Sequence, residues 1–132
     1  MTAARDWVLE AAAAAADKKA ERIVILDVSK QLVITDYFVI ASGANDRQVR
    51  TVAEEVERRL ATAHGIKPFR REGEREGRWV LLDYVDFVVH VFLREEREYY
   101  DLERLWSDAP AMEYEESWDD GTAPMERAAK AT

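Results

Sequence analysis

The chain has 132 residues, 48% of them hydrophobic and 35% charged, with a formal net charge of -8 and no cysteine. This length suits a single domain with a core of its own, and the lack of cysteine excludes disulfides, thiolate metal sites and cysteine nucleophiles. Because an acidic chain is repelled by phosphate backbones, we expect little direct contact with nucleic acid and favour a basic protein as partner.

The N-terminal region predicts a helix over residues 2–20, because alanine is the best helix former and neither glycine nor proline interrupts the run. Asp6 and Glu10 precede the alanines, so the segment lacks the basic flank of a signal peptide. No apolar run approaches the roughly 20 residues of a membrane-spanning helix. We therefore expect no membrane association and a cytoplasmic location.

Two β-branched runs come next, at residues 22–29 and 36–43, and such unbroken runs are typical of strands covered on both faces. The clearest helix follows them. It is expected to begin after an N-cap at Asn45, with Gln48 as the capping-box partner, and to end at Gly65, which suits the left-handed residue that closes a helix.

The remaining elements are a short edge strand and charged loop over residues 66–78, two strands at 79–84 and 87–92, and a helix over 94–106. In this last helix we expect five side chains to pack on the sheet, namely Tyr99, Tyr100, Leu102, Leu105 and Trp106. Its charged residues are expected to face solvent, namely Glu95, Glu96, Arg97 and Glu98.

Residues 107–132 differ in composition, since they are rich in acids and have only scattered apolar side chains. We predict a disordered acidic tail, dispensable for folding, after a single α/β domain over residues 1–106. The strand–turn–helix order around Gly43 implies a parallel connection, whereas residues 79–92 predict an antiparallel hairpin. The expected fold is therefore α/β, with a mixed, mostly five-stranded sheet flanked by helices.

The predicted hairpin is the most apolar part of the chain, yet it contains two aspartates and a histidine. If Val85 and Asp86 form a two-residue turn, Asp83 lies opposite Val88. Asp83 and His90 are then diagonal neighbours, within reach of a hydrogen bond. Period-two alternation puts six side chains on one face of the sheet: Trp79, Leu81, Asp83, Val88, His90 and Phe92.

Three interpretations of these polar residues compete. A hydrolase is disfavoured because no serine sits in a G-x-S-x-G elbow and cysteine is absent. Metal-dependent nucleotidyl transfer would use the amides of "IASGAND" for a phosphate and Asp83 with Asp86 for magnesium, but these carboxylates are three residues apart across a turn. A protein-binding face is the third interpretation, since a tryptophan beside carboxylates at the end of a sheet is typical of an interface hot spot.

The chain resembles the ribosomal silencing factor family, also called the Iojap family. The matching segments are "KKAERIVILDVS", "TDYFVIASG" with "RQV" shortly after, "EG" at Glu72-Gly73, "GRWVLLDY" with Asp86 and "VVHVF", and "REYYDLERLW". Together they span almost all of residues 18–106. The family usually has glycine where Val85 stands, so this turn departs from the pattern, and valine there resists a positive φ.

The resemblance implies a nucleotidyltransferase-like fold without catalytic residues, no cofactor, and a function in translation. Family members bind the large-subunit ribosomal protein numbered fourteen, block joining of the small subunit and lower translation during nutrient shortage, and they often self-associate. The alternative function is a metal-dependent nucleotide-binding or nucleotidyltransferase-type enzyme. The resemblance and the hairpin face together predict eight partner-binding residues: Glu72, Trp79, Asp83, Tyr84, Asp86, His90, Tyr100 and Glu103.

Overall fold

The structure is a computed structural model that describes residues 3–114. Over that range, six strands form one sheet in the order β3–β4–β5–β2–β1–β6. β2 and β5 pair in parallel, whereas the neighbouring pairs are antiparallel, so the sheet is mixed, as predicted. In chain order the elements are α1 (Ala3–Asp17), β1 (Glu21–Asp27), β2 (Tyr37–Gly43), α2 (Asp46–His64), β3 (Arg70–Glu72), β4 (Trp79–Asp83), β5 (Phe87–Leu93), α3 (Arg94–Tyr100), α4 (Leu102–Leu105) and β6 (Ala111–Glu113).

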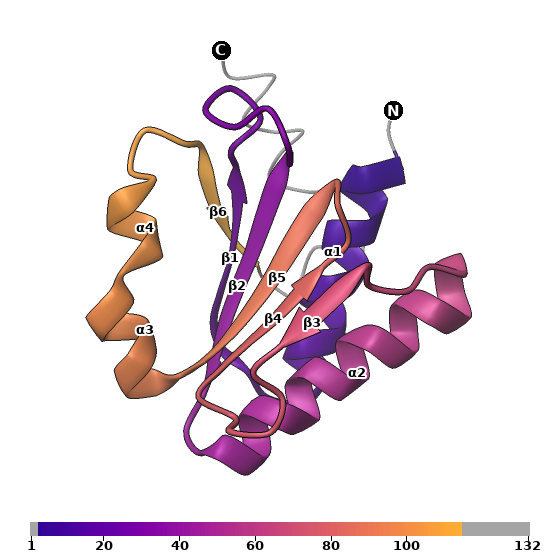
Figure 1. The fold of residues 1–132 in the computed structure, drawn as a ribbon, viewed down its shortest axis with the longest axis vertical. Helices are drawn as coiled ribbons and strands as arrows, with labels where there is room; N and C mark the ends of the chain where they lie inside the picture. The colour runs from indigo at the N-terminus through magenta and orange to yellow at the C-terminus, as the bar shows by residue number, and fades with distance from the viewer. Residues whose placement is uncertain (1–2, 115–132) are drawn as a thin grey trace.

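The two faces of the sheet are covered unequally. α1 and α2 pack on one face, and α3 and α4 lie over part of the other (Figure 1). The larger core joins the alanines of α1 and the valines of α2 to inward side chains such as Val80 and Val89. The smaller core gathers Phe38, Ile40 and Phe92 beneath Trp106. The second face therefore stays open towards the β3 edge.

The caps of α2 follow the sequence signals closely. The Asn45 side chain accepts a hydrogen bond from the Gln48 N–H at 2.8 Å, and Gly65 has the left-handed φ of 69° at the C-cap. The reciprocal bond of the capping box is displaced by one residue, because the Gln48 side chain accepts from the Ala44 N–H rather than from Asn45. None of the helices described between residues 3 and 114 is long and apolar enough to cross a membrane.

The register of the β4–β5 hairpin matches the prediction. Asp83 pairs with Val88, and Leu81 pairs with His90. On the outer side β3 pairs with β4 as the expected short edge strand. A β-carbon at Gly73, after β3, would collide with the backbone carbonyl of Trp79, so only glycine fits there.

The hairpin turn carries the strain that the sequence suggested. The Tyr84 N–H donates to the Phe87 carbonyl at 2.9 Å, which leaves a two-residue turn. Val85 has a φ of 75°, and the Asp86 N–H donates to the Tyr84 carbonyl at 2.9 Å. This is the rare γ-turn with a positive central φ, which a β-branched residue adopts only at a cost.

Replacing Val85 with glycine is therefore expected to raise the free energy of unfolding by about 1 kcal/mol, because glycine has no β-carbon to clash at positive φ. Urea denaturation measures the change. Val33→Gly is the matched control, since Val33 is fully exposed and is not among the positive-φ residues, so added chain freedom should make that variant slightly less stable. A loss of stability in Val85→Gly would show that contacts of the valine outweigh its strain.

The predicted domain boundary at residue 106 is wrong for the residues just beyond it. Ala111–Glu113 forms β6, which pairs with β1 and makes the sheet six-stranded rather than five-stranded. Ala109 is buried, and the Tyr114 N–H donates to the Ile23 carbonyl at 2.8 Å. A chain that ended at Asp108 would lose an edge strand. The rest of the predicted tail, residues 115–132, lies outside the described residues.

The last predicted helix is broken at Asp101, which has a φ of 49°. Leu102 and Trp106 pack on the smaller core as expected, but Tyr99 and Leu105 are largely exposed, so their predicted burial is wrong. The expectation that Arg97 faces solvent is also wrong, since it is 2% exposed. A break shifts every later side chain around the helix axis, so the spacing of one continuous helix does not apply across it.

Candidate functional site

An aromatic cluster lies on the open face of the sheet, where β4 and β5 meet α3. Trp79 is partly buried, and its ring centroid lies 4.8 Å from that of Phe92 and 4.7 Å from that of Tyr100. Its indole N–H donates to Nδ1 of His90 at 3.1 Å. The predicted face is thus correct, and it brings Trp79, His90 and Tyr100 together from three elements.

His90 is a buried, neutral histidine rather than a proton-transfer group. Its side chain lies among Phe38, Trp79 and Phe92, and burial lowers its pKa to about 4. An indole nitrogen only donates, so Nδ1 is the acceptor and the ring hydrogen is on Nε2. The expected hydrogen bond between Asp83 and His90 does not form: Nδ1 of His90 accepts from Trp79, and Nε2 has no partner among the described residues.

Asp83 is used by the turn and by the edge strand instead. Its Oδ1 accepts from the Val85 N–H at 2.9 Å, which supports the strained turn. Its Oδ2 lies 3.6 Å from the guanidinium of Arg70, and Arg70 also lies 3.5 Å from the carboxylate of Glu72. Asp86, at the tip, is exposed as predicted. Glu72, Asp83 and Asp86 therefore form an acidic rim along one end of the open face.

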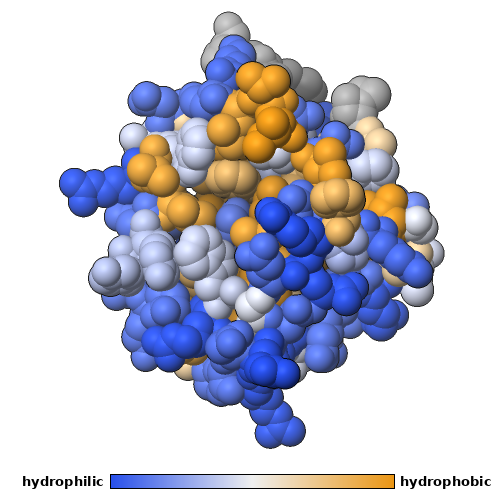
Figure 2. Space-filling model, viewed as in Figure 1, coloured by the Kyte–Doolittle hydropathy of each residue, from blue (hydrophilic) through white to orange (hydrophobic). Residues whose placement is uncertain are grey.

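Beside this rim is a hollow of about 380 Å³, here called the apolar groove. It lies between the loop that joins β1 to β2 and the β3 edge, and Figure 2 shows the apolar side chains gathered at this end of the molecule. Ile34 and Phe69 are each 80% exposed on its walls. The lining residues are Leu32, Ile34, Thr35, Phe38, Phe69, Arg70, Leu81, Asp83, Val85, Val88 and His90.

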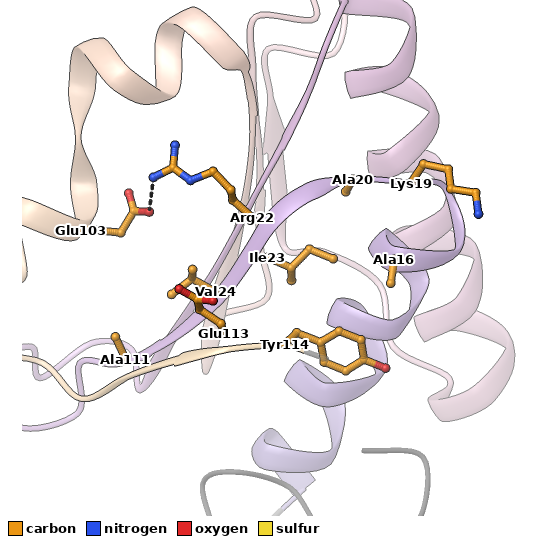
Figure 3. A pocket seen from close by; sticks show the side chains of 10 residues that line it. All are labelled: Ala16, Lys19, Ala20, Arg22, Ile23, Val24, Glu103, Ala111, Glu113 and Tyr114. Atoms are coloured by element: carbon orange, nitrogen blue, oxygen red, sulfur yellow. Dashed lines mark ion pairs between the residues drawn. The ribbon is translucent and has the colours of Figure 1, made fainter. Parts of the chain in front are cut away.

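Two predicted partner-binding residues lie away from this surface. Tyr84 is buried in the larger core and stacks on Phe87, and burial raises the pKa of its hydroxyl. Glu103 lies in a second hollow of about 800 Å³ between the end of α1, β1, α4 and β6. Figure 3 shows its carboxylate turned towards the guanidinium of Arg22, at 3.9 Å. Tyr84 and Glu103 therefore lie apart from the open face, and their part in partner binding stays a prediction.

Three residues that the sequence analysis did not single out have roles in the structure. Arg97 donates to Glu103 at 2.6 Å and also to the Ser42 hydroxyl and the Glu21 carbonyl, both at 3.2 Å, so it ties the last two helices to the sheet. Ile34 lies in the loop between β1 and β2, and Phe69 directly precedes the edge strand β3. Apolar side chains within otherwise polar connections were the signal that could have identified these two.

The strand–helix junction after Gly43 offers little to a phosphate. The Ala44 N–H is taken by the Gln48 side chain and the Gln48 N–H by Asn45, so two of the amides that could face an anion are already bonded. Across residues 3–114, no cluster of three or more histidine, aspartate or glutamate side chains is placed to hold a metal ion. The caps of α2 thus occupy two of the amides that the nucleotidyl-transfer interpretation assigned to a phosphate.

Comparison with known proteins agrees with the resemblance. The family model described as "Ribosomal silencing factor during starvation" matches residues 2–132. The ribosomal silencing factor of Bacillus subtilis is 49% identical over 100 residues, which cover 76% of this chain and 84% of that protein. The one from Halalkalibacterium halodurans is 46% identical over 99 residues, covering 75% and 84%. An X-ray structure of a Chromobacterium violaceum protein matches with a TM-score of 0.75 at 38% identity, covering 78% of this chain and 85% of that one.

Proposed function

Because the chain belongs to the ribosomal silencing factor family, we propose that it binds the large ribosomal subunit through the ribosomal protein numbered fourteen. Bound there, it blocks joining of the small subunit by its volume alone and lowers translation when nutrients are short. Steric blocking requires only a bound domain and no catalysis. A docking surface on the sheet is sufficient for that role.

The observation that carries this proposal is the composition of the open face. It combines a partly exposed aromatic pair, Trp79 and Tyr100, with an acidic rim that includes Glu72, Asp83 and Asp86. Aromatic anchors next to charged rims are typical of protein interfaces, and an acidic rim suits a basic ribosomal protein better than RNA. His90 contributes indirectly, because its Nδ1 accepts the indole N–H of Trp79 and so holds that ring in position.

The proposal places the protein with ribosomes in the cytoplasm. Self-association, which the family resemblance implies, has a separate candidate surface on α3 and α4. Tyr99 and Leu105 are exposed there, 81% and 72% respectively.

Co-sedimentation with purified subunits tests the proposed function. The protein should pellet with large subunits and not with small subunits, and pre-bound protein should reduce the yield of joined ribosomes. Calorimetry with nucleotide and magnesium is run in parallel. Nucleotide binding without binding to large subunits would favour the nucleotidyltransferase-type enzyme instead.

Asp86→Lys is expected to weaken binding to large subunits about fivefold at low salt, because it reverses an exposed charge on the rim that faces a basic partner. The loss should lie mainly in the association rate and should shrink as salt is added. Glu54→Lys, an exposed charge reversal on α2 at the covered face, is the matched control. Equal effects of the two variants would mean that only net charge matters and that Asp86 is not at the interface.

A further inference from the structure

Two buried polar groups in the apolar groove lack hydrogen-bond partners. These are Nε2 of His90 and the hydroxyl of Thr35, and neither has a partner among the described residues. Both residues line the groove, with 5% and 6% exposure. Since Nδ1 of His90 accepts from Trp79, Nε2 carries a hydrogen with no acceptor. Native proteins keep few such groups, because an unsatisfied buried donor destabilises the fold.

The walls of the groove are apolar and accessible. Ile34 stands on one side and Phe69 on the other, each 80% exposed, with Val85 at the end. A volume of about 380 Å³ is within the range of pockets that enclose a ligand or a small group of side chains. Exposed apolar surface of this kind marks binding sites.

The charges around the groove indicate which partner fits. Asp36 and Asp86 are both exposed at the same end of the sheet, where the Asp36 N–H donates to the Asp86 carbonyl at 2.9 Å. Asp83 and Glu72 share the single guanidinium of Arg70. These four carboxylates, two of which share Arg70, favour a cationic partner.

We propose that the apolar groove holds one anchor segment of the basic ribosomal protein. The segment inserts an uncharged apolar side chain between Ile34 and Phe69, presents an oxygen acceptor to the donors of His90 and Thr35, and places a lysine or arginine against the carboxylates. This inference rests on the proposed function and deepens it, since it names the part of the partner that is recognised and the pocket that recognises it.

The test compares neighbouring residues of the same loop. Ile34→Ser should weaken binding to the isolated ribosomal protein and to large subunits about tenfold or more, because the anchor loses an apolar wall. Val33→Ser is the matched control: Val33 is fully exposed and does not line the groove, so affinity should stay within about twofold of wild type. Neither variant should change the melting temperature appreciably, since both side chains already face solvent.

Thr35→Val supplies a second, independent arm. The substitution keeps the shape and removes the unpaired hydroxyl, so the free protein should be as stable as wild type or slightly more stable. Binding should nevertheless weaken about fivefold, because the partner's acceptor loses a donor. If Thr35 were purely structural, the substitution would not weaken binding while stability stays the same or increases.

The outcomes separate this inference from the proposed function. If wild-type protein binds large subunits and Ile34→Ser and Thr35→Val bind equally well, the groove is not the anchor pocket, and the proposed function stands. If Val33→Ser weakens binding as much as Ile34→Ser, the contact is a general apolar one and the groove is again excluded. If wild-type protein binds neither large subunits nor the isolated ribosomal protein, the proposed function fails, and this inference fails with it.

Discussion

Trp79→Ala should lower the free energy of unfolding by about 3 kcal/mol, at the lower end of the range for losing a packed tryptophan, because the side chain is only partly buried. Its ring packs against Phe92 and Tyr100, and its N–H is the hydrogen bond that satisfies Nδ1 of His90. Thermal and urea denaturation measure the loss. Trp79→Phe separates the two contributions, since it keeps most of the packing and removes only the donor.

The same substitution should weaken binding to the ribosomal protein by about 2 kcal/mol or more, mainly through faster dissociation, if Trp79 is the anchor proposed above. Binding is therefore measured at a temperature where the variant is still folded. Trp79→Ala and Asp86→Lys variants that both fold and both retain wild-type affinity would place the docking face elsewhere, and α3 would become the next candidate. A destabilised variant with unchanged affinity would assign Trp79 a structural role alone.

Glu103→Leu should destabilise the fold by about 3–5 kcal/mol, because it leaves the guanidinium of Arg97 buried without its carboxylate. Burial raises the pKa of Glu103, but the hydrogen bond and charge of Arg97 outweigh that effect and hold the pKa below its usual value. The ionised pair is thus the favoured state. Urea denaturation of the single variant checks the size of the loss.

The double variant Arg97→Met with Glu103→Leu is the decisive comparison. It removes both charges together, so it should recover most of the stability that the single variant loses. Glu98→Leu is the control, since Glu98 is exposed on α3 next to Arg97. It should change stability by no more than about 0.5 kcal/mol. A cost below 1 kcal/mol for Glu103→Leu would mean that other contacts hold α3 and α4 to the sheet.

This ion pair also bears on the docking surface. Arg97 donates to the Glu21 carbonyl beside the irregularity in the β1–β2 pairing, so it joins α3 to the sheet. Tyr100 lies on the same helix and contacts Trp79. Loosening the pair should therefore disturb the aromatic cluster as well as the fold.

Local chemistry determined much of this protein directly from its sequence. The Asn45 and Gly65 caps bounded α2, because capping depends on residues within one turn of the helix end. Alternation and a two-residue turn were enough for the register of β4 and β5, whereas the positive φ of Val85 runs against the preference of valine and is known only from the structure. The strand–turn–helix order around Gly43 and the hairpin over residues 79–92 predicted the mixed sheet, and the similar proteins and solved structure place the chain in the family that its segments resemble.

Only the tertiary structure decided what depends on contacts between distant residues. Ala111–Glu113 is too short to show a strand pattern and becomes a strand because the edge of β1 is there to pair with it. Arg97 is buried because Glu103, Ser42 and the Glu21 carbonyl converge on it from separate elements. Ile34, Thr35 and Phe69 form one groove only once the sheet brings the β1–β2 loop opposite β3. Residue spacing along the chain does not predict such long-range contacts, since they depend on how the helices and the sheet pack together.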